Sequence, residues 1–287
     1  MKQGGEVYRY DGTWKGFLCC VFECFERREI PADIQGGEGA QQSLYPARLV
    51  RTDPERSRRV ARWLSTTLGG EVSELAREGF LSSLPQKEMH ILRLLLLARR
   101  LGPMAASAHG DRSVAALRTA VYQMHQEAHL LTGFIRFVEH DGVLTATISP
   151  KHQVLQRLGP HFSDRFPGER IVIYDDTHGL VLWCRAGQWG VVRASVQFPP
   201  PDAAEEQWRQ LWKRFYRVIG IEGRENPRCR MTHMPKRYWV HMTEMEEEAP
   251  NRPKPALRAA DTEDWRGQEH PGLPAQAKGD LAPGGPI

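Results

Sequence analysis

The sequence predicts an α+β protein, in which a helical N-terminal half packs with a mostly antiparallel sheet and a basic C-terminal helix and loop close the fold. Apolar residues recur with a period near 3.6 in four early segments and alternate with a period of two between residues 133 and 196. Helical spacing returns at 202–218. At 287 residues, 40% of them hydrophobic, the chain is long enough to bury a substantial core.

The N-terminal half is expected to contain helices at 13–28, 53–68, 85–101 and 111–131, with a short strand and the Asp11-Gly12 turn before the first and a loop at 35–43. The second helix has clear boundary signals, because Asp53 can cap it, Pro54 stands in its first turn and Gly69 follows it. The fourth carries an apolar stripe that should be buried: Val114, Leu117, Val121, Met124, Ala128 and Leu131. Glu127 and His129 lie off this stripe.

The sheet is expected to begin with a hairpin on Asp141-Gly142, because Asp-Gly suits a tight two-residue turn. A helix near 151–163 follows, and then strands that turn at 176–179 and 186–188. The helix at 202–218 begins acidic and ends basic, which matches its own macrodipole. Its apolar positions share one face, so we expect them in the core rather than as base-stacking platforms: Trp208, Leu211, Trp212, Phe215, Tyr216 and Ile219.

One α+β domain is expected over residues 1–244, with a helical part at 1–131 and a sheet-containing part at 132–244. Residues 245–287 are expected to be a disordered tail. The segment 250–287 has seven prolines, five glycines and few large hydrophobic residues, so it cannot bury enough apolar surface to offset its ordering entropy.

Composition excludes few classes of protein. The apolar run at 92–98 is too short to cross a bilayer, and the polar N-terminus shows no signal-peptide pattern, so we expect a cytoplasmic protein with no membrane partner. Five cysteines, three of them crowded at 19–24, make a poor disulfide framework. Cys20 and Cys24 lack further ligands at close spacing, so we expect buried thiols, no metal and no cofactor.

The clearest functional signal is the segment 220–244, GIEGRENPRCRMTHMPKRYWVHMTE. Between Arg209 and Arg237 the chain has nine Lys or Arg residues against two acids, which is typical of polyanion binding but also of a solvated face. Candidate nucleic-acid-binding residues are Arg224, Arg228, Arg230, His233, Lys236 and Arg237. Alternatively, the two prolines stiffen a loop that buries Tyr238 and Trp239; we expect both, with the cations facing outward.

A second candidate site is a polar set that could meet at one edge of the sheet: Glu127, His129, Arg136, His152, His161, Arg165 and Asp175. Imidazoles and carboxylates can act as acids and bases, and Glu127, His129, His161 and Asp175 are the catalytic candidates. No metalloprotease-like histidine spacing and no glycine-rich phosphate loop supports them, so ordinary surface or capping roles are the alternative. Cys184 lies within a predicted strand and is expected to be an inert buried thiol, and Cys229, between Arg228 and Arg230, lacks an evident base.

Four blocks together resemble a known bacterial family: YRYDGTWKGFLCCVFECFERRE (8–29), EAHLLTGFIRF (127–137), HFSDRFPGERIVIYDDTHG (161–179) and FYRVIGIEGRENPRCRMTHMPKRYW (215–239). This family is a domain of unknown function described as DNA-metabolism proteins, and the resemblance spans about residues 6–244. Its members are encoded beside a radical S-adenosylmethionine (radical SAM) protein thought to modify or repair DNA. In other proteins the domain precedes a uracil-DNA-glycosylase-like domain. The resemblance implies a DNA context without naming a reaction.

We therefore expect a DNA-binding accessory factor in DNA repair or modification, working with a radical SAM partner that performs the chemistry. Two alternatives stay open. One is an enzyme that acts directly on DNA through the histidine and carboxylate set. The other is a protein-interaction scaffold without nucleic-acid contact, which would have an exposed apolar patch.

Overall fold

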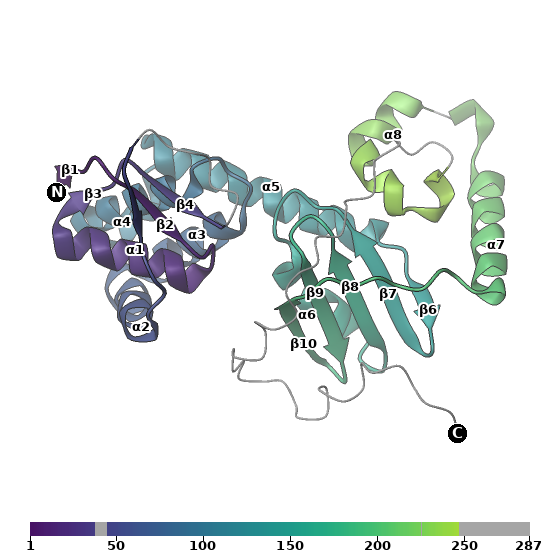
Figure 1. The fold of residues 1–287 in the computed structure, drawn as a ribbon. Coiled ribbons are helices and arrows are strands. Elements are labelled where there is room, and N and C mark those ends of the chain that lie inside the picture. The colour runs from purple at the N-terminus through teal and green to yellow at the C-terminus, as the bar shows by residue number, and fades with distance from the viewer. Residues whose placement is uncertain (38–44, 225, 247–287) are drawn as a thin grey trace, which may run out of the picture.

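The computed structural model describes residues 1–37, 45–224 and 226–246. It confirms the α+β class: a helical N-terminal lobe, a long connecting helix, a lobe built on a five-stranded sheet, and a helical segment packed beside that sheet (Figure 1). Most of the loop expected at 35–43 and of the tail expected at 245–287 lies outside the described residues. None of the described helices is long and apolar enough to cross a membrane.

The N-terminal lobe contains two small parallel sheets. Strand β2 pairs with two later strands on either side of it, and β1 pairs with the strand after the first helix. The bounds are β1 Lys2–Gln3, β2 Val7–Tyr10, β3 Glu29–Ile30, β4 Asp33–Gly36 and β5 Ala47–Leu49. Only a strand before residue 11 was predicted. The others have two to four residues and pair with partners far along the chain, so they leave little periodic signal.

Helices form the rest of this lobe: α1 Trp14–Arg27, α2 Pro54–Trp63, α3 Gly70–Leu81 and α4 Lys87–Leu101, with a π-helical turn at Leu64–Leu68 and a 3₁₀ turn at Gly102–Ser107. Side-chain oxygens of Thr13 and Asp53 cap α1 and α2. Helix α3 was not predicted, because Gly69 and Gly70 resemble the end of α2; in fact the chain turns at Gly69, whose φ is +90°, and a new helix starts at once.

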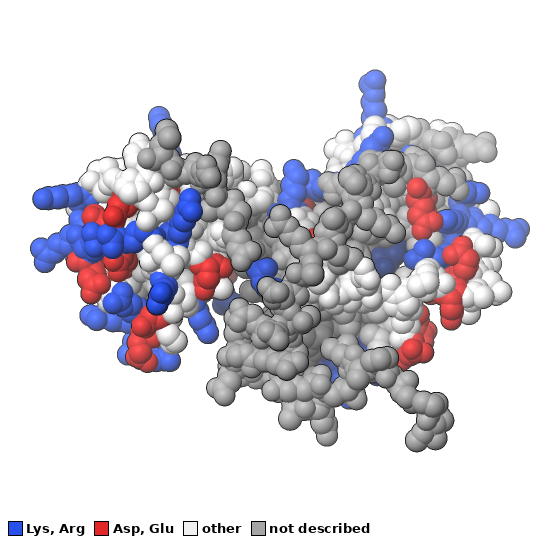
Figure 2. All heavy atoms as spheres, viewed as in Figure 1, with Lys and Arg blue, Asp and Glu red and all other residues white. Residues whose placement is uncertain are grey.

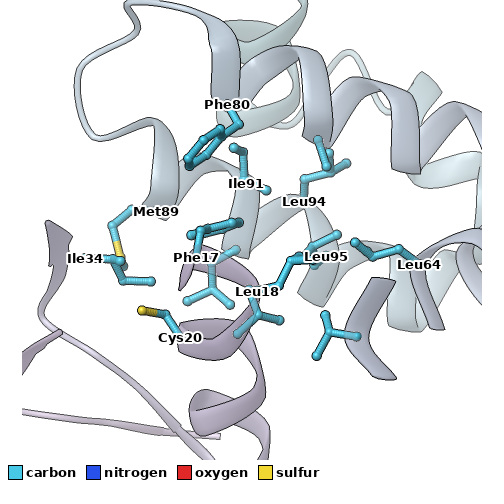
Figure 3. Packing of buried hydrophobic residues seen from close by; sticks show 14 of the residues in the cluster. Phe17, Leu18, Cys20, Ile34, Leu64, Phe80, Met89, Ile91, Leu94 and Leu95 are labelled. Carbon is cyan, nitrogen blue, oxygen red and sulfur yellow. The ribbon is translucent and has the colours of Figure 1, made fainter. Parts of the chain in front are cut away.

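The first hydrophobic core lies between α1 and the helices α2 to α4 (Figure 3). Phe17 and Leu18 of α1 meet Ile91, Leu94 and Leu95 of α4 there, and all five are at most 1% exposed. The three crowded cysteines, Cys19, Cys20 and Cys24, are buried in the same core, and burial raises the pKa of each thiol. Their predicted role as buried hydrophobic residues is confirmed.

Helix α5, Arg112–Phe134, joins the two lobes. Its first half, through Val121, packs in the N-terminal core, and its second half, from Met124, packs in a second core with the sheet. The change between cores therefore falls inside the helix rather than after residue 131. Whether the two parts fold as one unit stays a prediction.

The second lobe is built on a sheet with the order β10-β9-β8-β7-β6. The bounds are β6 Val138–His140, β7 Val143–Ile148, β8 Arg170–Asp175, β9 Leu180–Arg185 and β10 Gln188–Arg193, with α6 Leu155–Arg165 between β7 and β8. Three pairings are antiparallel, as predicted, and the β7–β8 pairing is parallel because α6 is a crossover connection. Asp141 and Gly142 both have positive φ, as the predicted hairpin turn requires.

The remaining described elements are α7 Ala203–Ile219, a 3₁₀ turn at Glu222–Arg224, α8 Pro227–His233, and two further 3₁₀ turns, η4 Lys236–His241 and η5 Thr243–Met245. The segment expected to be a loop around Pro227 is therefore mostly helical, with Pro227 in the first turn of α8. Tyr238, Trp239 and Met245 are at most 3% exposed in the second core, so Tyr238 and Trp239 are core residues as predicted. Met245 shows that the packed chain continues past residue 244.

Candidate functional site: a basic aromatic segment and an adjoining polar cluster

Most of the apolar face of α7 is exposed, so the prediction that it belongs to the core is wrong for Trp208, Leu211, Phe215 and Ile219, whereas Tyr216 is half-buried and packs against the second core. No residue of α7 is buried, and Trp208, Phe215 and Val218 are 68%, 52% and 75% exposed. Leu211 and Ile219 stand on the same face with more than half of their surface exposed. The amphipathic pattern predicts the helix and its apolar face. It does not show whether this face is covered by another part of the same chain or by another molecule.

The side of α7 that carries Arg209, Trp212 and Lys213 attaches the helix to the body. Arg209 and Lys213 pair with Glu246 at 3.2 and 2.6 Å, and the Trp212 indole N–H donates to Glu244 at 2.9 Å. Glu244 also binds the Arg136 guanidinium through both oxygens. Two of the nine cations counted in the sequence, Arg209 and Lys213, therefore share one acid just beyond the segment, Glu246.

The predicted nucleic-acid-binding residues fall into two groups. Arg224, Arg228, His233 and Lys236 are exposed. Arg224 and Arg228 form no ion pair with another described residue, and neither does Arg214 on α7. A hollow of about 440 Å³ lies along α7, lined by Gln210, Lys213, Arg214, Arg217 and Val218. Figure 2 shows Lys and Arg side chains projecting from the α7–α8 part of the molecule.

Arg230 and Arg237 are instead engaged in packing. The guanidinium of Arg230 lies over the Trp239 ring, 5.1 Å from its centroid, and that of Arg237 lies 4.5 Å from the Tyr238 ring. Arg237 also pairs with the buried Glu127 at 3.2 Å. Arg237 therefore faces the body of the protein, contrary to the expectation that these cations point outward. Lys236 is exposed, with its ammonium over Trp239.

Glu127 is the centre of a buried polar network. It is 2% exposed, although its position off the apolar stripe predicted a different surface. Its carboxylate accepts the backbone N–H groups of Lys151 and His152 and the Tyr238 hydroxyl, at distances between 2.8 and 3.1 Å. A carboxylate in this position accepts two backbone N–H groups of the β7–α6 connection and ties the C-terminal segment to α5. These contacts describe a structural anchor.

His152 belongs to the same network. Its Nδ1 accepts the Ser83 backbone N–H at 3.0 Å, which holds the ring in the tautomer that carries its proton on Nε2. Burial lowers the pKa of His152, and the charges of Arg237, Lys151 and His178 lower it further, against the opposing effect of Glu127.

Asp175, the last residue of β8, orients His178. Asp175 is fully buried, and one of its oxygens accepts the backbone N–H groups of Thr177 and His178 at 3.1 Å. The other oxygen is 2.7 Å from Nδ1 of His178. Burial raises the pKa of Asp175, while these donors act in the opposite direction. The pair leaves Nε2 of His178 without a partner among the described residues.

A second imidazole lies beside the end of β7. Nε2 of His241 is 2.8 Å from the Ser149 hydroxyl and 3.8 Å from the Asp176 carboxylate. Sequence reasoning missed Ser149, Asp176, His178 and His241. The local sequence DDTH could have indicated the Asp175–His178 turn, because an Asp side chain often caps the backbone two or three residues later. His241 is 92 residues from Ser149, so no local pattern could have paired them.

The other members of the predicted polar set lie elsewhere. His129 and His161 are exposed, and none of their contacts in the described chain reaches the residues around Glu127 and Asp175. Arg165 is exposed beside Phe166. The structure therefore places Glu127 and Asp175 among the residues described above, but not the two histidines proposed to act with them. No group of three or more His, Cys, Asp or Glu side chains in the described residues is arranged to hold a metal ion.

Residues 85–244 match the family model described as a domain of unknown function, DUF4130. The match covers more than half of the chain. The chain belongs to this family. The matched region runs from α4 into η5. It therefore includes the whole second lobe, the α7–α8 segment and the polar residues around Glu127 and Asp175. No curated protein and no solved structure matches the chain.

Proposed function

We propose that this DUF4130 protein is a DNA-binding accessory factor that holds single-stranded DNA along α7 and α8. The observation that carries the proposal is the exposure of large aromatic side chains beside free cations on one segment. Trp208 and Phe215 are more than half exposed, and Arg214, Arg224 and Arg228 have no acidic partner among the described residues. Rings that are open to solvent can stack on unpaired bases while guanidinium groups neutralise phosphates.

The role of an accessory factor rests on the family resemblance and on the exposed cations and aromatic rings of the α7–α8 segment. The hollow along α7 is lined by Lys213, Arg214 and Arg217, and the exposed rings of Trp208 and Phe215 stand on the same helix, so this segment can position a strand. The partner that we propose is the radical SAM protein encoded beside members of the family, acting in DNA repair or modification. In that arrangement this chain presents the DNA and the partner performs the reaction.

The test is a fluorescence anisotropy titration of single-stranded and duplex oligonucleotides at several salt concentrations. We expect preference for the single strand, and a slope of log K against log salt that falls by about 2 in Arg214→Ala/Arg224→Ala/Arg228→Ala, because each phosphate contact contributes about 0.7 on single strands. Trp208→Ala should weaken binding about fivefold or more at every salt concentration, since stacking contributes about 1–3 kcal/mol per base.

The matched control is Arg51→Ala/Arg62→Ala/Arg100→Ala, which removes the same charge from exposed positions of the N-terminal lobe. If the two triple variants weaken DNA binding equally, the loss is explained by net charge and not by a binding surface on α7 and α8. Absence of binding at low salt would refute the proposal.

A second candidate follows from the aliphatic part of the same face. Leu211, Val218 and Ile219 are 56%, 75% and 56% exposed, and aliphatic side chains suit a protein partner better than a base. If Leu211→Ser/Val218→Ser leaves DNA binding unchanged but abolishes co-purification with the radical SAM protein, this edge of α7 is where the partner docks.

A further inference from the structure

Glu246, just beyond the basic segment, binds two cations of α7 with its two carboxylate oxygens. Its Oε1 is 3.2 Å from Nη1 of Arg209, and its Oε2 is 2.6 Å from Nζ of Lys213. Arg209 and Lys213 stand one turn apart on α7, and Lys213 also lines the hollow along this helix. The two side chains therefore already hold one anion in common, beside the surface that is proposed to hold DNA.

We propose that Arg209 and Lys213 form a phosphate subsite, which Glu246 occupies until a phosphodiester of single-stranded DNA displaces the carboxylate. The inference rests on the proposed function for the identity of the ligand. It adds two phosphate contacts to those of the cations without an acidic partner, and it makes Glu246 an internal competitor that limits the affinity for DNA.

A phosphodiester matches what Glu246 provides to the two cations. Its two unesterified oxygens share one negative charge, as the two carboxylate oxygens do, so they can accept from the same guanidinium and ammonium groups. Arg217 stands one turn beyond Lys213 and lines the same hollow. A strand seated at Lys213 can therefore continue past cations that follow one another about 6 Å apart along the helix axis.

The contacts of Glu246 allow it to leave without detaching α7. Its side chain is 41% exposed, and Arg209 and Lys213 are its only side-chain partners among the described residues. Exposed ion pairs are weak, and each changes an equilibrium by a factor of about five or less.

Glu244 holds the helix independently of Glu246. The Glu244 side chain is 1% exposed, and it accepts hydrogen bonds from the Trp212 indole and the Arg136 guanidinium. Tyr216 of α7 also packs against the second core. The two acids therefore differ in role: Glu244 anchors α7, and Glu246 occupies a site that another anion can take.

The experiment compares binding of a single-stranded oligonucleotide by the full-length wild type and by Glu246→Gln, using fluorescence anisotropy at low salt. Glu246→Gln removes the competing charge and keeps the shape of the side chain, so we expect the affinity to rise about threefold or more. The matched control is Glu206→Gln, because Glu206 is an exposed glutamate of α7 with no ion pair to another described residue. Both variants change the net charge equally, so a rise confined to Glu246→Gln reports the subsite.

A second comparison tests whether Glu246 acts through the two cations. In the background Arg209→Ala/Lys213→Ala, the groups for which the carboxylate competes are absent. Glu246→Gln should then raise the affinity no more than Glu206→Gln does in the same background. Thermal melting shows whether each variant is folded. A full rise in this background would contradict the assignment of the subsite to Arg209 and Lys213.

Phosphate binding is also measured without DNA. Titration with inorganic pyrophosphate is followed by NMR on the indole N–H of Trp212, which stands between Arg209 and Lys213 in the sequence of α7 and is assigned with Trp212→Phe. We expect a saturable shift, with a midpoint at about threefold lower concentration in Glu246→Gln than in wild type.

The two measurements separate this inference from the proposed function. If DNA binds but Glu246→Gln and Glu206→Gln have equal affinities, the subsite is overturned and the proposed function stands. If no DNA binds at low salt while Glu246→Gln still lowers the pyrophosphate midpoint, the proposed function fails and the phosphate subsite stands. The absence of a pyrophosphate shift at Trp212 in both proteins overturns the subsite.

Discussion

Replacing Glu127 tests whether it is an anchor or a catalytic group. The carboxylate is 2% exposed and accepts from two backbone N–H groups, the Tyr238 hydroxyl and the Arg237 guanidinium. Glu127→Ala leaves all four donors without that acceptor in a buried site. Each unsatisfied buried group costs about 1–3 kcal/mol, and removing one member of a buried ion pair costs about 3–5 kcal/mol. Because the losses overlap, we expect the free energy of unfolding to fall by about 3–5 kcal/mol.

The assay is urea-induced unfolding followed by circular dichroism and by tryptophan fluorescence, since Trp239 is buried in the affected core. Glu127→Gln keeps the shape and one acceptor oxygen, so it should lose about 1–3 kcal/mol. Glu74→Ala is the matched control: an exposed helical glutamate without a partner among the described residues, expected to stay within about 0.5 kcal/mol of wild type. A Glu127→Ala protein as stable as Glu74→Ala would refute the anchor.

Two further changes probe the same lobe. Burial lowers the pKa of His152, and the Ser83 backbone N–H donates to its Nδ1, so the folded state prefers the neutral ring. The stability that the neutral ring contributes is fully present above the unfolded pKa of about 6.5 and is lost as the pH falls below that value. The melting temperature of wild type should therefore decline between pH 7.5 and 5 more steeply than that of His152→Gln, and parallel declines would contradict this. Trp212→Phe removes the indole N–H that Glu244 accepts, which should cost about 1.5–3 kcal/mol in urea unfolding, whereas Trp208→Phe at an exposed position should cost almost nothing.

The sequence determined most of the local structure, because local structure depends on neighbouring residues. The caps of Thr13 and Asp53, the Asp141-Gly142 turn and the apolar stripe of α5 all act within a few residues, and each is present. The burial of Tyr238 and Trp239 was also predictable, since large aromatic residues at the end of a folded segment favour the core.

The tertiary structure decided where side chains with two possible roles lie. Helix α7 has the same amphipathic pattern whether its apolar face is covered or open, and only the packing of Trp212 and Lys213 against Glu244 and Glu246 leaves Trp208 exposed. Glu127 became an anchor because Tyr238, 111 residues later, donates to it. Ser149 and His241 likewise meet across 92 residues. Contacts at such separations depend on the path of the whole chain, so residue spacing predicts the chemistry that is present but not the groups that share a site.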